Sequence, residues 1–270
     1  MTGATSGIGR EIALKLARAG ARVLAVGRRQ QRLDQLVEEF SASDATSARP
    51  VAGVSHDVKG AISPLSGDLT LAEDRQRWVD WCQACWGGLD LLIHNAGAGA
   101  IGRFDSSPPD RLRKLMEVDF FGPVELTRLC LPLLETGRVG MMSRTGKPAI
   151  VIIGSVLAHR AVPLKSDYCA AKFAMRGWAE SLRCELAGQG IEVLQIDPST
   201  TRSEFLNSMI DTPVGTKSRS IGSMSSESVA KLTVRAIERS QRRVILSLGG
   251  RALVSASRWI PSIVDRILSK

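Results

Sequence analysis

The sequence has few of the features that mark several protein classes. None of its apolar runs reaches the 18 residues that suggest a membrane-spanning helix. Its five cysteines are odd in number and irregularly spaced, which suits a reducing compartment better than a disulfide framework. The N-terminus opens on a glycine-rich turn instead of the apolar core of a signal peptide. We therefore expect a cytoplasmic protein, with peripheral contact to the inner membrane surface as an alternative.

Metal-binding and nucleic-acid-binding patterns are also missing. The three histidines, His56, His94 and His159, show no metal-ligand spacing, so we expect no metal site. Cys82-x-x-Cys85 has no second pair and is better explained as a packing face of a helix. The net charge of +9 would suit an acidic membrane surface, nucleic acid or an anionic cofactor. Nucleic acid is the weakest of these, because the arginines are scattered and no array of stacking aromatics accompanies them.

A serine, a tyrosine and a lysine follow one another at a suggestive spacing. Tyr168 and Lys172 are four residues apart in a proline-free segment, 167–186, so a helix would put both on one face. Ser155 comes just after the apolar run 149–153, which predicts a buried strand. The intervening loop can fold back and bring the hydroxyl to the phenol.

Such a trio can move a proton to or from an alcohol or carbonyl oxygen. The ammonium of Lys172 should lower the pKa of Tyr168 from its ordinary value near ~10, and Ser155 should orient the substrate oxygen. An ordinary exposed Tyr–Lys pair would have the same spacing. A cofactor site elsewhere in the chain is needed to decide between the two interpretations.

The N-terminal residues 2–9, TGATSGIG, have the glycine spacing of a dinucleotide-binding turn and precede a predicted helix, 10–19, and strand, 21–26. Glycines let the backbone approach a pyrophosphate, and the helix start offers free N–H groups. A simple helix cap would also use glycine, but the position before a helix and a strand favours the cofactor. The predicted contacts in this turn are Gly3, Thr5, Ser6, Gly7, Ile8 and Gly9.

Only Met1 precedes this turn, although a dinucleotide-binding turn should follow a strand. That strand is central in a doubly wound sheet, and its absence leaves neighbouring strands with unpaired backbone groups. We expect the native polypeptide to carry further apolar residues upstream. A degraded, inactive copy is the alternative.

Cofactor choice is indicated by Arg28 and Arg29, which follow the predicted strand 21–26. An acidic residue there would bind the ribose hydroxyls of NAD, whereas arginine suits the 2′-phosphate of NADP. NADP is therefore favoured over NAD, with Arg28 as the preferred contact. Two solvated arginines at a helix start are the alternative.

Further strand ends should complete the cofactor site, since ligands bind at the carboxyl ends of parallel strands. Pro64 predicts that strand 61–66 lies at a sheet edge. Residues 203–224 are a candidate substrate lid. The strand-end residues predicted to contact the cofactor are Asp68, Leu69, Asn95, Ala96, Gly97 and Pro198.

The C-terminal residues 251–270 have an amphipathic pattern. They combine arginines with apolar residues at helical spacing, namely Trp259, Ile260, Ile263, Val264, Ile267 and Leu268. Such a segment can lie on a membrane surface, or pack on the protein body or a second subunit. We predict a single NAD(P)-binding and catalytic domain, 1–248, followed by an amphipathic tail, 249–270.

Taken together, these motifs resemble the short-chain dehydrogenase/reductase family over essentially the whole chain. The match comprises Thr2–Gly9, Asn95–Gly97, Ser155, Tyr168-x-x-x-Lys172 and Pro198. The resemblance implies an α/β fold with one Rossmann-like, doubly wound parallel sheet of seven strands, of which the first is apparently missing here. It also implies metal-free, NAD(P)-dependent interconversion of an alcohol and a carbonyl, with Tyr168 and Lys172 also contacting the cofactor. Helices around 109–134 and 167–186 correspond to the family's usual oligomer interface.

Two departures from the family pattern concern the site. Asp119 stands where the family usually has the asparagine of a proton path, and its carboxylate adds a charge near Lys172. Pro198 is followed by a serine, where the family usually has a glycine. Ser203 lies where members of the family commonly have a hydroxyl residue that contacts the carboxamide of the nicotinamide. The C-terminal portion loosely resembles the membrane-associated branch that handles lipid-like or steroid-like substrates.

The sequence thus predicts an NADP-dependent oxidoreductase acting on a small-molecule alcohol or carbonyl, in a homo-oligomer. Its catalytic residues would be Ser155, Tyr168, Lys172 and Asp119. A catalytically impaired dinucleotide-binding or scaffold protein is the alternative, suggested by Asp119 and the missing strand. Fatty acyl, steroid, sugar and small ketone substrates all remain compatible with the sequence.

Overall fold

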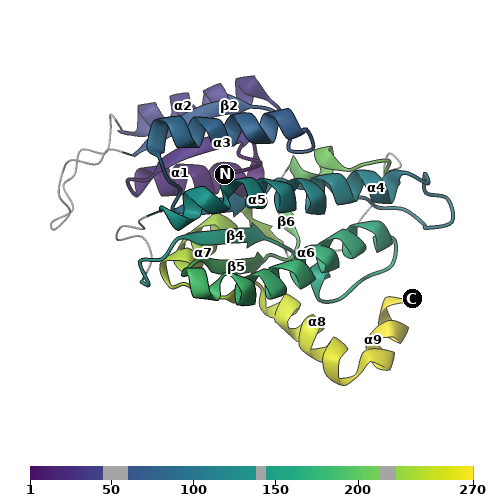
Figure 1. Ribbon diagram of the computed structural model, residues 1–270. Coiled ribbons are helices and arrows are strands. Elements are labelled where there is room, and N and C mark those ends of the chain that lie inside the picture. Colours follow the sequence, from purple (N-terminus) through teal and green to yellow (C-terminus); the bar gives the residue numbers. More distant parts are fainter. Residues whose placement is uncertain (45–59, 138–143, 203, 213–222, 270) are drawn as a thin grey trace.

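The computed structural model describes residues 1–44, 60–137, 144–202, 204–212 and 223–269, with helices on both faces of a parallel sheet (Figure 1). Each strand alternates side chains between two buried clusters. Val23 and Ala25 pack with α1 (Gly7–Arg18), α2 (Gln30–Asp44) and α7 (Ser226–Glu238). Leu24 and Val26 face the opposite cluster, formed with α3 (Ala72–Trp86), α5 (Gly122–Glu135) and α6 (Ser166–Glu185). This two-sided burial explains the continuous apolar strand sequences and confirms the doubly wound α/β prediction.

The sheet is divided into two parts. One pairs β1 (Arg22–Gly27) with β2 (Ala61–Ser66), and the larger has the order β3 (Leu91–His94), β4 (Ala149–Ile153), β5 (Glu192–Asp197) and β8 (Arg243–Ile245). All of these pairs are parallel. Pro64 lies in β2, which pairs only with β1 among the described strands, so the edge prediction is confirmed.

Met1 and Thr2 occupy the position between the two parts. Thr2 forms a parallel bridge with Val26, and its N–H donates to the carbonyl of Ile93 at 2.9 Å. Two residues therefore stand where the resemblance implies a whole central strand. Among the described residues, the implied seven strands are represented by six strands and the bridge at Thr2. The existence of upstream residues stays a prediction.

The helical region around 109–134 is continuous but changes its helix type partway along. The chain runs from α4 (Arg111–Met116) through a π-helical turn, Glu117–Phe121, directly into α5. Pro123 is tolerated because it falls in the first turn of α5. The wider π-helical turn carries Asp119 and buries its side chain.

The C-terminal tail forms two helices instead of one. Helix α8 (Leu248–Trp259) and α9 (Pro261–Leu268) form a hairpin that projects from the body (Figure 1). Pro261 begins the second helix, and α9 is fastened to the body by buried Val264 and an Arg160–Asp265 ion pair. Within the described residues, no helix has the length and apolar character needed to cross a bilayer. The division of the chain at residue 248 stays a prediction.

Candidate active site

The predicted serine, tyrosine and lysine lie together. Tyr168 and Lys172 project from the first two turns of α6, with the lysine Nζ 5.4 Å from the centre of the phenol ring. Ser155 follows the end of β4, where its Oγ caps a short turn by accepting from the N–H of Leu157 at 3.1 Å. The Ser155 hydroxyl is near enough to the phenol to act on it and lowers the pKa of Tyr168. The loop between β4 and α6 therefore folds back as the spacing predicted.

The charge balance on Tyr168 differs from the expectation. Burial raises the pKa of Tyr168 and is the largest influence on it. The ammonium of Lys172 and the hydroxyl of Ser155 oppose this, whereas the charge of Asp119 adds to it. The result is a raised pKa, so the prediction of a lowered pKa for Tyr168 is wrong.

Asp119 faces Lys172 from the π-helical turn. Its Oδ2 lies 3.5 Å from the lysine Nζ, and its Oδ1 accepts from the N–H of Ala98 at 2.9 Å. Burial raises the pKa of Asp119, against the effect of Lys172. Burial would lower the pKa of Lys172, but Asp119, Tyr168 and Asp197 together raise it. We conclude that Lys172 holds its proton as an ammonium beside the phenol.

Two residues that the sequence interpretation missed support the serine. Asp197, fully buried at the end of β5, accepts from the backbone N–H of Ser155 at 3.1 Å through Oδ1. Its Oδ2 lies 2.7 Å from Nε2 of His159. A Cβ on Gly154 would lie 2.2 Å from the same carboxylate, so only glycine fits there. The available signal was a charged residue ending an apolar strand, which must find partners if it is buried.

The glycine-rich turn fits an anionic cofactor. Gly3 and Gly7 have positive φ angles of 67° and 56°, and a Cβ on Gly9 would lie 2.2 Å from the carbonyl of Gly3. The side chain of Ser6, the N-cap of α1, makes no capping hydrogen bond, and the first turn of α1 has no acidic residue. The positive end of α1 is thus left for a phosphate group.

Asn95 and Gly97 connect this turn to the predicted catalytic residues. The Asn95 side-chain N–H donates to the carbonyl oxygens of Thr2 at 3.2 Å and Gly3 at 3.0 Å. A Cβ on Gly97 would lie 2.9 Å from Oδ1 of Asp119 and 3.4 Å from Nζ of Lys172. The predicted dinucleotide-binding turn and the helix that carries Tyr168 and Lys172 are therefore neighbours.

The structure places Arg29 at the glycine-rich turn. Its guanidinium donates to the hydroxyls of Thr5 at 3.1 Å and Ser6 at 2.8 Å. It also pairs with Glu204 at 3.3 Å. Arg28 is exposed, and its predicted role as the preferred phosphate contact stays a prediction.

The remaining predicted residues lie at strand ends. Asp68 follows β2 and accepts through Oδ1 from the backbone and side chain of Thr70. Leu69 is buried. The carbonyl of Pro198 accepts from the N–H of Val156 at 3.0 Å. Ser203 and residues 213–222, together half of the predicted lid, lie outside the described residues.

Little space is left beside the phenol. A cavity of about 30 Å³ borders Tyr168, and its lining includes Phe205 and Met209. The ring centres of Phe205 and Tyr168 are 6.1 Å apart in an edge-to-face arrangement. The short 3₁₀ turn Glu204–Ser208, inside the predicted lid, thus covers the phenol of Tyr168.

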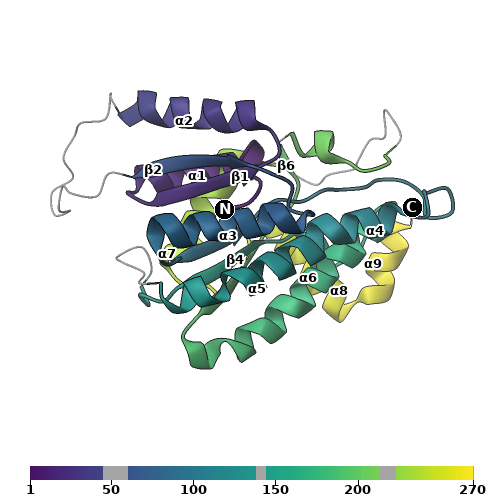
Figure 2. The ribbon, with the colours of Figure 1, turned by 45° about the horizontal axis from the view of Figure 1, so that its top comes forward.

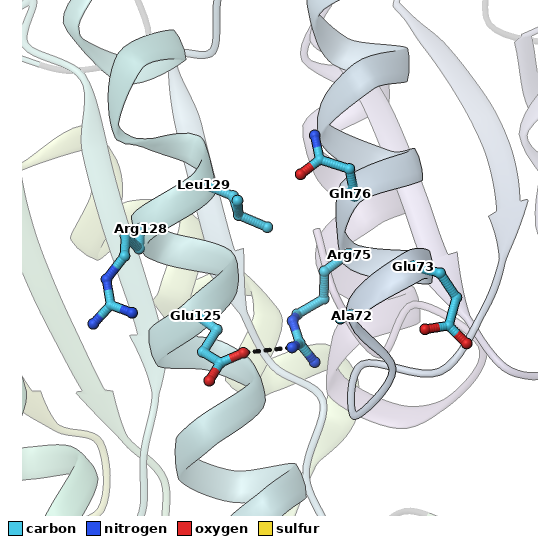
Figure 3. Close-up of a pocket in the computed structure, with 7 residues that line it drawn as sticks. All are labelled: Ala72, Glu73, Arg75, Gln76, Glu125, Arg128 and Leu129. Carbon is cyan, nitrogen blue, oxygen red and sulfur yellow. Dashed lines mark hydrogen bonds and ion pairs between the residues drawn. The ribbon is translucent and has the colours of Figure 1, made fainter.

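A larger groove of about 510 Å³ lies elsewhere, between α3 and α5 (Figure 3). The Arg75–Glu125 ion pair crosses it, and a second N–H of Arg75 donates to the carbonyl of Leu69 at 2.7 Å. None of the predicted site residues lines this groove. We place the candidate active site at Tyr168 because the phenol lies there beside the hydroxyl of Ser155 and the ammonium of Lys172. The α3–α5 groove is larger, but the described residues that line it hold no such set of proton-transfer groups.

Comparison with known proteins agrees with this arrangement. The short chain dehydrogenase family matches residues 1–213, and the chain belongs to that family. Dehydrogenase/reductase SDR family member 7B from Bos taurus is 33% identical over 202 residues, which cover 73% of this chain and 56% of the relative. The chain therefore spans little more than half the length of this relative.

Solved structures share the fold at low identity. A short chain dehydrogenase/reductase from Burkholderia phymatum, in complex with NAD, is 20% identical with a TM-score of 0.79, covering 97% of this chain and 93% of its own. A short-chain dehydrogenase from Sphingobium yanoikuyae, in complex with NADPH, is 24% identical with a TM-score of 0.73, covering 97% and 94%. These likenesses establish the fold of the chain.

Proposed function

We propose that the chain is an NADP-dependent oxidoreductase that interconverts a secondary alcohol and a carbonyl. The observation that carries this proposal is the cluster of Ser155, Tyr168 and Lys172 beside a glycine-rich turn. The segment Asn95–Gly97 links the cluster to the turn. Gly97 lies against Lys172, and the side chain of Asn95 donates a hydrogen bond to the turn at Gly3. Membership of the short chain dehydrogenase family supports the same activity.

In the reductive direction, Tyr168 donates its proton to the carbonyl oxygen of the substrate while Ser155 holds that oxygen by a hydrogen bond. A bound nicotinamide supplies the hydride. The ammonium of Lys172 stabilises the phenolate that remains. Asp119 keeps Lys172 protonated through its carboxylate at 3.5 Å. In the oxidative direction the phenolate removes the alcohol proton.

The Tyr168→Phe variant tests this assignment, because it removes the phenolic proton and leaves the ring. We expect turnover with NADPH to fall by about 10²-fold or more, the usual effect of losing a general acid. Binding of NADPH, measured by its fluorescence, should stay within about twofold of the parent chain. Turnover within tenfold of the parent chain would remove Tyr168 from the catalytic role.

NADP is proposed over NAD because two arginines follow β1 and one of them, Arg29, reaches the hydroxyls of the glycine-rich turn. The relatives bind either cofactor, as the NAD and NADPH complexes illustrate.

The Arg28→Asp and Arg29→Asp variants should each be compared by the ratio of kcat/KM for NADP to that for NAD. We expect at least one variant to lower this ratio by about tenfold, the worth of a charge-assisted phosphate contact. Arg113→Asp, an exposed arginine of α4, is the control. An unchanged ratio in both variants would contradict the NADP assignment.

The second candidate is a catalytically impaired dinucleotide-binding or scaffold protein. It is favoured by Asp119, which replaces an amide by a buried carboxylate against Lys172. A cofactor-dependent absorbance assay over a panel of carbonyl compounds separates the two, since only the oxidoreductase consumes NADPH.

We also propose a cytoplasmic homo-oligomer. Large apolar side chains are exposed on the helices that the family resemblance assigns to the interface, namely Leu112 (40%), Phe121 (44%) and Phe173 (41%). The free cysteines among the described residues suit a reducing compartment. Sedimentation velocity of the chain, with and without Phe121→Ser and Phe173→Ser, tests the interface.

A further inference from the structure

The helices α8 and α9 expose more large apolar side chains than any comparable described segment of the body. Five residues contribute to this surface, which we call the tail surface: Leu248 (81% exposed), Trp259 (79%), Ile260 (46%), Ile263 (55%) and Ile267 (65%). Both views show the hairpin standing at the margin of the molecule (Figures 1 and 2). Burying five such side chains requires a partner or another medium.

The exposed large apolar side chains of α8 lie on one side of the helix. Leu248 and Trp259 are eleven residues apart, which is three helical turns, so both lie on the side opposite buried Gly250. Arg251 and Arg258 are seven residues apart and lie along one flank of that side. The solvent side of α8 therefore carries two large apolar side chains, with exposed Ala252 and Ser255 between them and arginines on one flank.

In α9 the protein body covers only part of the apolar stripe. Val264 is buried against the protein, while Ile263 and Ile267, four residues apart, continue the stripe into solvent. Arg266 lies beside them and is exposed. This combination of apolar, tryptophan and arginine side chains is typical of helices that lie in a membrane interface.

The charge of the hairpin identifies the kind of partner. Residues 248–268 contain three arginines and a single acidic residue, Asp265, which is already paired with Arg160 of the body. A second copy of the same surface would add three more arginines and no free carboxylate to neutralise them. An anionic lipid surface complements both the cations and the apolar side chains.

The helices are also suited to lie on a bilayer and not to cross it. With 12 and 8 residues, α8 and α9 span roughly 18 Å and 12 Å, well short of the ~30 Å hydrocarbon core. We propose that the tail surface is a docking site for an anionic phospholipid membrane. This inference goes beyond the proposed oxidoreductase activity and does not depend on it.

Docking there would hold the serine loop near the bilayer. A Cβ on Gly250 of α8 would lie 2.7 Å from the side chain of Val156, the residue after Ser155. Arg160, which pairs with Asp265 of α9, ends the same loop segment. The membrane-facing hairpin is thus in direct contact with the segment 156–160 that leads from the catalytic serine toward α6.

Vesicle co-sedimentation of the full 270-residue chain tests the proposal. One set of vesicles contains phosphatidylcholine alone, and the other a three-to-one mixture of phosphatidylcholine and phosphatidylglycerol. We expect binding to the mixed vesicles, much weaker binding to phosphatidylcholine, and release at high salt because screening weakens the arginine contacts. Vesicle binding is measured without turnover, so its failure and a failure of the proposed activity are distinguishable.

Matched variants locate the contact. Trp259→Ser with Ile263→Ser should lower the partition coefficient on mixed vesicles by about tenfold or more, since each side chain contributes apolar area. Phe104→Ser is the apolar control, because Phe104 is 77% exposed on a different loop. Arg258→Gln with Arg266→Gln should weaken binding to mixed vesicles only, with Arg113→Gln and Arg128→Gln, two exposed arginines of α4 and α5, as the charge control. Thermal unfolding verifies that every variant is folded.

Two results would overturn the proposal. One is vesicle binding that is absent, or equal in the tail and control variants. The other is a concentration-dependent dimer, seen by sedimentation velocity without vesicle binding, that Trp259→Ser with Ile263→Ser abolishes. In that case a second copy covers the tail surface, and the charge argument is wrong.

Discussion

At the residue scale, the candidate site combines two opposite charges and a phenol with strong burial. Lys172 lies between a phenol and a carboxylate, and the carboxylate of Asp119 both retains the lysine proton and opposes ionisation of Tyr168. An asparagine would keep the hydrogen bond from the N–H of Ala98 without this charge. Asp119 therefore sets the pH range in which the phenol can act.

The Asp119→Asn variant should shift that range downward. Removing the negative charge lowers the pKa of Tyr168, because Asp119 is one of the groups that raise it. The phenolate then forms at lower pH, and alcohol oxidation, which needs the phenolate, should begin its rise at lower pH. Tyr168 is the only tyrosine in the sequence, so the ultraviolet absorbance of tyrosinate reports this one group.

The control for this prediction is Asp80→Asn, which removes an exposed carboxylate on α3. It should leave the tyrosine titration and the pH profile unchanged. If Asp119→Asn has the same tyrosine titration as the parent chain, the coupling between the two groups is absent.

A contact between two site residues could be predicted from the sequence only where the residues are close together along the chain. Tyr168 and Lys172 were found because four residues on one helix fix their relative position. The Asp197–His159 contact joins residues 38 positions apart and depends on two loops meeting at a sheet edge. The direction of the Tyr168 pKa shift was missed for a similar reason, since burial is a property of the folded molecule.

At the element scale, the turn Glu204–Ser208 connects the two halves of the site. Glu204 pairs with Arg29 at 3.3 Å and with Arg32 at 3.6 Å. One residue later, the ring of Phe205 lies against that of Tyr168. The carboxylate of Glu204 therefore holds Arg29, one of the two arginines proposed to meet the 2′-phosphate of NADP.

Glu204→Gln should strengthen NADP binding, because the phosphate then no longer competes with a carboxylate for Arg29. An exposed ion pair is worth about 0.5–1 kcal/mol, which corresponds to roughly a two- to fivefold lower Kd. The Kd of NADPH can be measured by fluorescence titration, and that of NADH should change less. Glu227→Gln, which breaks an exposed pair with Lys15, is the control. An NADPH affinity equal to that of the parent chain would refute the competition.

Element boundaries show what a local pattern can and cannot predict. Strand β2 and strand β4 coincide with the predicted ranges, because breaks in the apolar pattern mark both ends. The π-helical turn around Asp119 was not predicted, since its cause is the tertiary contact of that carboxylate with Lys172 and Ala98. The break of the tail at Pro261 was readable from the sequence, as proline commonly begins a new helix.

At the scale of the whole molecule, burial of His94 affects the stability of the fold. His94 ends β3 and contacts α5, its Nε2 lying 2.7 Å from the hydroxyl of Thr127. Burial lowers the pKa of His94 from 6.5 to about 3. The folded chain keeps this imidazole neutral in a pH range where the unfolded chain protonates it.

Stability should consequently fall as the pH drops from 6.5 toward 3. The folded pKa is below the unfolded one, so the unfolded state binds the extra proton throughout this window. Between pH 6.5 and 5 the loss is about 2 kcal/mol, from 1.36 kcal/mol for each pH unit. Urea unfolding at pH 7 and pH 5 measures it, and His94→Phe should remove this part of the pH dependence.

The control is His56→Gln, which removes a histidine from the region between α2 and β2. It should retain the acid sensitivity of the parent chain. An equal loss of stability in His94→Phe would assign the effect to other groups.

The overall architecture was predictable because alternating helices and apolar strands admit few arrangements other than a doubly wound sheet. The gap at the sheet centre was also expected from the single residue before the turn. The bridging role of Thr2 was not, because it depends on Val26 and Ile93 approaching from two separate strands. Pattern alone does not show how a chain closes such a gap.

The turn that contacts both Arg29 and Tyr168 has a kinetic consequence. We expect a nucleotide phosphate that competes with Glu204 for Arg29 also to loosen the ring of Phe205 over the phenol, so that space for the second reactant would open after the nucleotide has bound. In the proposed oxidoreductase the nucleotide would then add first and leave last.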